Sequence, residues 1–159
     1  MIASGPGAEE LARLEIEVLP RLMRLVVATA SENSPEGFLS MTQFHVLKRL
    51  ARGPWLGSEL AQELRITPPT VSAAIDSLVR RGLVSRGEIP EDRRAVPLQL
   101  TPEGRRCLEA VQERMVLALA GILEQIAPEE RLALQTALKA LARVTASHPE
   151  PSLPLHDRL

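Results

Sequence analysis

The feature that most constrains the fold of this chain is the segment 55–84, whose sequence is WLGSELAQELRITPPTVSAAIDSLVRRGLV. Two stretches with apolar residues at helical spacing are separated here by a tight turn. Ser58 can cap the first helix, 59–64, and Thr67 can cap the second, 68–81. The second helix begins with a proline, which loses no hydrogen-bond donor at that position. The segment therefore predicts two short helices in close succession.

The apolar residues of these helices predict how they pack. Small Ala61 would let the second helix approach the first at a steep angle. This spacing is typical of a helix-turn-helix, although plain helical hairpins share it. Arg65 occupies the turn, where glycine would be the easier residue, so we expect backbone strain there. The residues assigned to the buried face are Leu60, Ala61, Leu64, Ile66, Val71, Ala74, Ile75 and Leu78.

The segment directly after these helices predicts a β-hairpin. One strand spans 83–86, and apolar residues at every second position from 96 to 100 indicate the other. Pro97 cannot donate a hydrogen bond, so its nitrogen should face away from the paired strand. The residues 55–56 are short and apolar enough to add a third strand. A hairpin beside a helix-turn-helix is a wing, so this part of the chain predicts a winged helix-turn-helix.

Amphipathic helices flank this unit on both sides. A helix over 9–31 comes first, and a second begins at Ser40, which forms a capping-box pattern with Gln43 and should end at Gly53 and Pro54. Beyond the hairpin, Thr101 can cap a long helix that reaches about residue 127. The segment PEERLALQTALKALARV then predicts a final helix with acidic residues in its first turn.

The flanking helices carry more apolar surface than a small winged helix needs. An interlocked homodimer would use that surplus, whereas a monomeric helical core is the simpler alternative. If the winged helix binds DNA, the two-fold symmetry of such a dimer predicts a pseudo-palindromic site with half-sites about one helical turn, ~34 to 36 Å, apart. The residues predicted at the dimer interface are Leu11, Leu14, Val18, Met115, Leu119, Ile122, Leu134, Leu138 and Leu141.

In the segments SELAQEL, PPTVSAAIDSLVRRGLVSR and PEDRRAVPLQLTPEGRR, and in the long flanking helices, the sequence resembles the MarR family of bacterial transcription regulators. The resemblance covers nearly the whole chain. It implies a mainly α fold: a winged helix-turn-helix with a small antiparallel β-wing, flanked by long N- and C-terminal dimerisation helices. It also implies a homodimeric repressor or activator that binds double-stranded DNA. Repression is the favoured outcome, and a small-molecule effector or an oxidant is the expected signal.

These expectations divide the chain into three parts. The MarR-type domain is expected to lie between a flexible N-terminus and a proline-rich C-terminal tail. Inside that domain, a DNA-binding lobe is expected between two sets of dimerisation helices. The predicted ranges are 1–8 for the N-terminus, 9–146 for the domain, 39–101 for the lobe, 9–31 and 102–146 for the dimerisation helices, and 147–159 for the tail.

The expected DNA contacts lie on the helix 68–81 and on the wing. A helix of this length is about 21 Å long, enough to lie in a major groove with its N-terminal end near base edges and phosphates. Arg80 and Arg81 stand at the other end, where they could equally serve the helix dipole and solvation. The predicted DNA-binding residues are Ser58, Thr67, Pro68, Thr70, Ser72, Ala73, Ser77, Arg80, Arg81, Arg86, Asp92, Arg93 and Arg94.

The wing residues Asp92, Arg93 and Arg94 have distinct expected roles. In an extended segment residues two apart share a face, so Asp92 can pair with Arg94 while Arg93 points the other way. The Asp92 carboxylate would then orient an arginine side chain. The family resemblance implies that a wing arginine reaches the minor groove, and the choice between Arg93 and Arg94 stays open.

Composition and motifs argue against other classes of protein. No window approaches the roughly 18 apolar residues of a membrane helix, and no signal sequence is present, so we expect a soluble, cytoplasmic chain. The histidines form no metal-ligand pattern and no nucleophile elbow or phosphate loop occurs, so we expect no enzyme, metal or cofactor. The net charge is −1, yet basic residues outnumber acidic ones by three over 48–94. A winged helix used for protein assembly without DNA contact remains the alternative function.

The single cysteine, Cys107, has two interpretations. Neighbouring Arg105 and Arg106 could activate it as an oxidant sensor, but a small buried hydrophobe is the favoured interpretation. A ligand pocket follows only from the resemblance. Its candidate lining residues, which have core roles as their alternative, are Phe38, Phe44, His45 and Met115.

Overall fold

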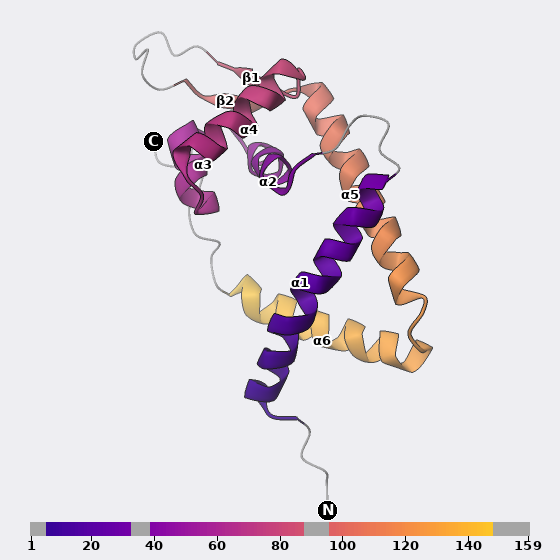
Figure 1. Cartoon of the computed structure of the whole chain (residues 1–159). Helices are drawn as coiled ribbons and strands as arrows, with labels where there is room; N and C mark the ends of the chain where they lie inside the picture. The colour runs from indigo at the N-terminus through magenta and orange to yellow at the C-terminus, as the bar shows by residue number, and fades with distance from the viewer. Residues whose placement is uncertain (1–5, 33–38, 88–95, 148–159) are drawn as a thin grey trace, which may run out of the picture.

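The computed structural model describes residues 6–32, 39–87 and 96–147. These residues form helices and one small two-stranded antiparallel sheet, which confirms the predicted mainly α fold with a β-wing. Figure 1 shows the sheet gathered with three short helices at one end of the molecule, while the longer helices extend away from it. In chain order the elements are α1 (Ala8–Glu32), α2 (Met41–Leu50), α3 (Gly57–Leu64), α4 (Pro68–Arg80), β1 (Val84–Arg86), β2 (Leu98–Leu100), α5 (Pro102–Leu123) and α6 (Pro128–Ala146).

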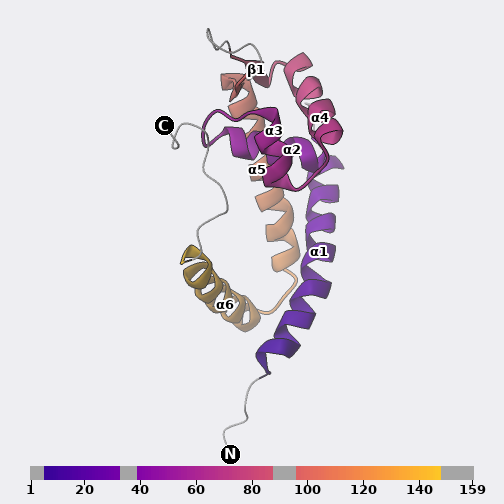
Figure 2. The same ribbon diagram turned by 90° about the vertical axis from the view of Figure 1, so that its left-hand side faces the viewer.

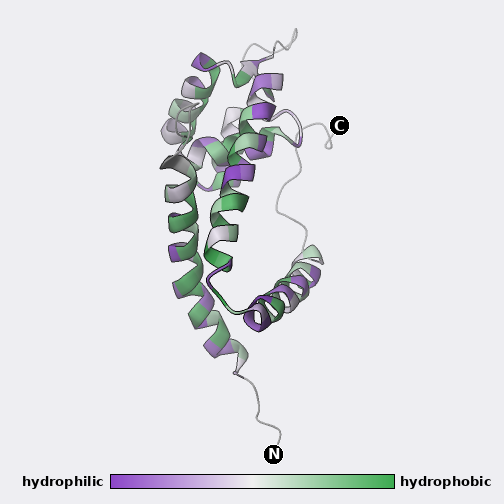
Figure 3. Cartoon of the chain, turned by 90° about the vertical axis from the view of Figure 1, so that its right-hand side faces the viewer, coloured by the Kyte–Doolittle hydropathy of each residue, from purple (hydrophilic) through white to green (hydrophobic). Residues whose placement is uncertain are grey.

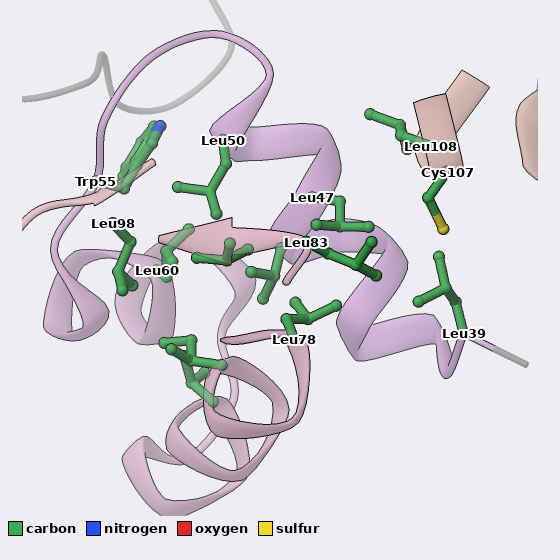
Figure 4. Close-up of a cluster of buried hydrophobic side chains, with 14 of the residues drawn as sticks. Leu39, Leu47, Leu50, Trp55, Leu60, Leu78, Leu83, Leu98, Cys107 and Leu108 are labelled. Atoms are coloured by element: carbon green, nitrogen blue, oxygen red, sulfur yellow. The ribbon is translucent and has the colours of Figure 1, made fainter. Parts of the chain in front are cut away.

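The winged lobe consists of α2, α3, α4, the sheet and the first turns of α5, and it surrounds one hydrophobic core (Figure 4). Leu47, Leu60 and Leu78, from α2, α3 and α4, are fully buried in it. An ion pair between Arg49 and Glu63, with 2.9 Å between nitrogen and oxygen, joins α2 to α3. The residues predicted for the buried face all contribute: Leu60, Ala61, Val71, Ala74, Ile75 and Leu78 are buried, and Leu64 and Ile66 are half-buried.

The turn between α3 and α4 passes through Arg65 in the left-handed region, with φ 53° and ψ 41°. No other non-glycine residue of the described ranges has a positive φ. A side chain crowds the backbone in this region, so the left-handed geometry is consistent with the strain predicted at this position. The N–H of Ile66 donates to the carbonyl of Ala61 at 3.1 Å, so the turn still closes the end of α3.

Of the two helix caps predicted here, one is wrong and the other is confirmed only in its position. Ser58 lies inside the first turn of α3 and is not its N-cap. Leu56 holds that position, because its N–H donates to the Glu59 carboxylate at 3.1 Å and the helix starts two residues earlier than predicted. Thr67 precedes α4 as predicted, but its hydroxyl bonds to the Thr70 hydroxyl at 2.8 Å and makes no cap hydrogen bond to the backbone.

Other helix ends shift by a few residues. The capping box of Ser40 and Gln43 is present, but α2 ends at Leu50 because shorter turns close it before Gly53. α4 ends one residue before the predicted end at 81. α5 ends at 123 rather than about 127, since three-residue turns replace helical bonds there and Arg131 donates to the carbonyl of Ile126 at 2.9 Å.

The wing sheet has the register Val84 with Leu100 and Arg86 with Leu98. Trp55 adds a single bridge to the other edge, where its N–H and carbonyl pair with those of Leu98 at 3.2 and 2.8 Å. The third strand predicted at 55–56 is therefore reduced to one bridge. β1 begins after Leu83, because the N–H of that residue is taken by the carbonyl of Leu78 at the end of α4.

The start of α5 is fixed tightly to the end of α4. The Thr101 hydroxyl accepts from the N–H of Gly104 at 2.9 Å, as predicted for an N-cap, and donates to the carbonyl of Gly82 at 2.7 Å. A Cβ atom on Gly104 would lie 2.0 Å from the carbonyl oxygen of Leu83. Only glycine allows this approach, so the wing and the long helix meet in close contact at this junction.

The long helices leave the winged lobe together. α1 packs along α5, and Figure 2 shows α6 at the far end from the lobe. Hydrophobic residues recur along α1 and α5 (Figure 3), and many of those on α1 are exposed in the single chain. α6 buries none of its residues, all of which are described. Among the helices that the structure describes, none has the length and apolarity needed to span a membrane.

Candidate nucleic-acid interface

The helix α4 has two sharply different faces. Its buried face packs on the lobe, while Pro69, Ala73 and Arg80 are exposed and Asp76 is half-buried on the opposite side. Steps of three and four residues place these four side chains on one stripe, which we call the outward face of α4. Pro69 and Asp76 were absent from the predicted site, although their helical spacing from Ala73 and Arg80 was a signal that could have found them. The geometry leaves this helix free to meet a large ligand along its length.

The N-terminal part of α4 brings several predicted site residues together. Thr67, Pro68, Thr70, Ser72 and Ala73 are all exposed there. Prolines occupy the first two helical positions and have no backbone N–H to donate. Any hydrogen bond to an anion at this end must therefore come from the nearby hydroxyl groups. A hollow of about 420 Å³ between this end, the start of α3 and the wing is lined by the predicted residues Ser58, Pro68, Ser72 and Arg86, together with apolar neighbours.

Ser77 is held on a different side of the helix. It is half-buried, and its hydroxyl oxygen accepts from the side-chain amide of Gln43 at 3.0 Å. This contact ties α4 to the start of α2. Ser77 therefore has a role inside the lobe that the sequence did not indicate, because the two residues are 34 positions apart.

The arginines at the end of α4 and in β1 also differ from one another. Arg80 is exposed on the outward face, whereas Arg81 is half-buried and forms the C-cap of the helix. Arg86, the last residue of β1, donates from Nη2 to the Asp76 carboxylate at 2.5 Å. The wing and the outward face of α4 are thus joined by a charged hydrogen bond. The predicted wing residues Asp92, Arg93 and Arg94 lie outside the described residues.

Cys107 belongs to the hydrophobic core, close to Leu39 and Leu108 (Figure 4). Only 4% of its surface is exposed, which supports the buried-hydrophobe interpretation, since oxidant-sensing thiols are usually accessible. In the ranges that the structure covers, no three His, Cys, Asp or Glu side chains cluster as metal ligands would.

Three of the four candidate pocket residues lie in described parts of the chain. Phe44 packs against the core and meets the ring of His45 edge-on, with 5.7 Å between ring centroids. Partial burial, followed by the charges of Lys48 and Arg49, lowers the pKa of His45 below its usual 6.5. Met115 is half-buried on α5, and Phe38 lies outside the described residues.

Comparison with known proteins agrees with this architecture. The model of the MarR family matches residues 39–96, a range that begins just before α2 and ends after β1, short of β2. The chain is 32% identical over 106 residues to the HTH-type transcriptional regulator YfiV of Bacillus subtilis, covering 66% of each protein. It is also 32% identical over 106 residues to the transcriptional regulator AdcR of Streptococcus pneumoniae, covering 65% of this chain and 73% of AdcR. These relatives are transcriptional regulators rather than enzymes.

A solved structure extends the similarity to the long helices. Wild-type MarR from E. coli, in its apo form, superposes with a TM-score of 0.66 at 26% identity, covering 82% of this chain and 96% of MarR. The comparison therefore includes flanking helices as well as the lobe. On the family match, the relatives and the shared fold, the chain belongs to the MarR family of transcriptional regulators.

Proposed function

We propose that the chain acts as a homodimeric repressor of transcription that binds a pseudo-palindromic operator, with α4 in the major groove and the wing in the minor groove. The observation that carries this proposal is the outward face of α4, which points away from the core. It has exposed hydroxyl groups near its N-terminal end and Arg80 at its C-terminal end. With 13 residues, α4 is about 20 Å long, a length that fits a major groove.

Charge and hydrogen-bonding groups on this face suit DNA. The hydroxyls of Thr67, Thr70 and Ser72 can donate to phosphate oxygens, and Arg80 supplies positive charge. Asp76 is the acidic residue of the outward face, and Arg86 neutralises it. The face therefore offers no isolated carboxylate to the phosphate backbone.

Exposed apolar residues on the long helices support the dimer. Leu11, Leu14 and Val18 on α1 are each at least 44% exposed in the single chain. Leu134, Leu138 and Leu141 are exposed along one side of α6, while the predicted interface residues of α5, Met115, Leu119 and Ile122, are half-buried. Covering such surface with a second copy would gain roughly 25 cal/mol per Å² of apolar area removed from water.

The dimer can be tested by measuring molar mass in solution by light scattering. Leu138→Glu places a charge among Leu134 and Leu141 and should yield a monomer. Leu132→Glu is the matched control, because Leu132 is 64% exposed but lies two residues, or about 200°, from Leu134 around the helix. A monomeric wild type, or a Leu138→Glu variant as dimeric as the control, would contradict this interface.

DNA binding can be tested by selecting bound sequences from a random duplex pool. The selected site should contain two half-sites about one turn, ~34 to 36 Å, apart. Binding to unrelated duplex should weaken steeply between two salt concentrations, because phosphate contacts release counterions. No binding to any duplex even at low salt would favour the alternative function, a winged helix used for protein assembly.

The wing can be tested on the selected site with Arg93→Ala and Arg94→Ala. At least one substitution should weaken binding about tenfold, as expected for a lost arginine contact to DNA. Wild-type affinity in both variants would remove the wing from the interface.

Repression is tested with a reporter gene behind the selected site, which should be less active when the protein is present and more active in its absence. The small-molecule effector stays a prediction of the family resemblance. It would be detected as a compound that releases the protein from the selected duplex.

A further inference from the structure

Asp76 stands on a surface where an acidic side chain is unexpected. It lies on the outward face of α4 between Ala73 and Arg80, one turn from each, and its side chain is 48% exposed. A carboxylate on a face that meets DNA repels the phosphate backbone unless a cation compensates it. Its presence there calls for a physical reason.

The compensating cation comes from the wing. Arg86 reaches from the end of β1 and donates from Nη2 to Asp76 Oδ1 at 2.5 Å. The side chains of Arg86 and Asp76 are 53% and 48% exposed, and ion pairs this open usually contribute little to folding stability. Stability of the lobe is therefore a poor explanation for the pair.

The geometry of a guanidinium group offers a better explanation. Arginine presents five N–H donors in a planar fork, and a partner on one nitrogen fixes the direction of the others. Arg86 also lines the hollow shared with Ser58, Pro68 and Ser72, next to the end of α4 that carries the exposed hydroxyls. The remaining donors of Arg86 are thus held beside the other groups that can bind phosphate.

We propose that Asp76 is a positioning residue, which holds the Arg86 guanidinium toward a DNA phosphate at the junction between recognition helix and wing. This inference rests on the proposed function. Asp76 acts through Arg86 and makes no contact with DNA itself. The cost of its negative charge is offset only while Arg86 is present.

The experiment is a double-mutant cycle on the selected duplex, with dissociation constants measured by fluorescence anisotropy. The proteins are wild type, Asp76→Asn, Arg86→Gln and the double variant. Asp76→Asn should weaken binding about fivefold when Arg86 is present, the size expected for losing the alignment of one charged hydrogen bond. In the Arg86→Gln background, the same substitution should tighten binding or leave it unchanged, because only the repelling charge is removed.

Other outcomes would overturn the proposal. Tighter binding by Asp76→Asn in both backgrounds would make Asp76 a simple repelling charge. Equal weakening in both backgrounds would mean that Asp76 supports the fold or contacts a base directly. No change in either background would leave the pair without a role in binding.

Salt dependence gives a second readout that a structural defect would not reproduce. Arg86→Gln should lower the slope of log affinity against log salt concentration by about one, the value for one lost phosphate contact. Asp76→Asn should lower it in the same direction. An unchanged slope in both single variants would contradict a phosphate contact by Arg86.

Glu103→Gln is the matched control. Glu103 forms an exposed ion pair with Arg106 on α5, so the substitution removes the same charge from a similar pair outside the outward face. It should not weaken binding. Failure of the wild type to bind any duplex would count against the proposed function itself, whereas a wild type that binds without coupling between Asp76 and Arg86 would count against this inference alone.

Discussion

The side-chain amide of Gln43 donates from Nε2 to the Ser77 hydroxyl oxygen at 3.0 Å, joining the start of α2 to α4. Through Oε1 the same side chain accepts from the N–H of Ser40 at 2.9 Å, so one residue caps α2 and holds α4. Gln43→Ala should lower the free energy of unfolding by about 1 to 2 kcal/mol, because two partly buried hydrogen bonds are lost. Urea denaturation measures this change.

Two further variants separate the parts of this effect. Ser77→Ala removes only the link between helices and should cost about half as much as Gln43→Ala. Gln62→Ala, at an exposed position of α3, is the control and should change stability by less than about 0.5 kcal/mol. If the Gln43→Ala variant were as stable as the control, the hydrogen bond between α2 and α4 would contribute nothing to the free energy of unfolding.

The contrast between Ser77 and Ala61 shows which parts of the molecule the sequence could predict. Ala61 was assigned to the helix–helix contact from apolar spacing alone, and it is buried as expected. The spacing of apolar residues and the presence of capping residues are local properties, so the lobe and most of its elements followed from them. Ser77 was assigned to DNA, but a partner 34 positions away holds it, and helical spacing does not reveal such partners.

Local competition explains the remaining differences. Ser58 had the right side chain for an N-cap, but the Glu59 carboxylate takes the N–H of Leu56 and starts the helix earlier. Asp76 was absent from the predicted site. Its pairing with Arg86 depends on how the wing turns back on α4, which only the folded chain reveals.

Replacing Gly104 at the start of α5 is predicted to lower the stability of the protein. Gly104→Ala would put a Cβ atom 2.0 Å from the carbonyl oxygen of Leu83, so the helix or the wing junction must shift. We expect a loss of about 2 to 3 kcal/mol in the free energy of unfolding, as for other forced overpacking. Denaturation in urea measures it.

The control for this prediction is in the same helix. A Cβ atom on Gly121 meets nothing within 4 Å, so Gly121→Ala should be neutral or should stabilise the protein by up to about 1 kcal/mol. Similar effects of the two substitutions would show that crowding at Gly104 does not limit the junction.

Arg65 offers the opposite case, a position where glycine should improve stability. Its φ of 53° is costly for an L-amino acid and free for glycine, so Arg65→Gly should raise the free energy of unfolding by about 0.5 to 1 kcal/mol. Arg65→Ala keeps the strain while removing the side chain, and it should give no such gain. A glycine variant no more stable than the alanine variant would show that the turn is unstrained.

His45 is predicted to titrate below the usual range, and the reason can be tested one charge at a time. Partial burial, then Lys48 and Arg49, disfavour the imidazolium, so an NMR titration should give a pKa below 6.5. Lys48→Gln should raise that pKa toward 6.5, while Lys139→Gln, on α6, should leave it unchanged.

The lowered pKa of His45 also predicts how stability depends on pH. Between the lowered pKa and 6.5 the unfolded chain binds more protons than the folded chain, so the free energy of unfolding should fall as the pH falls through this window and level off below it. His45→Gln should flatten that dependence, and an equally steep dependence in this variant would assign it to another group.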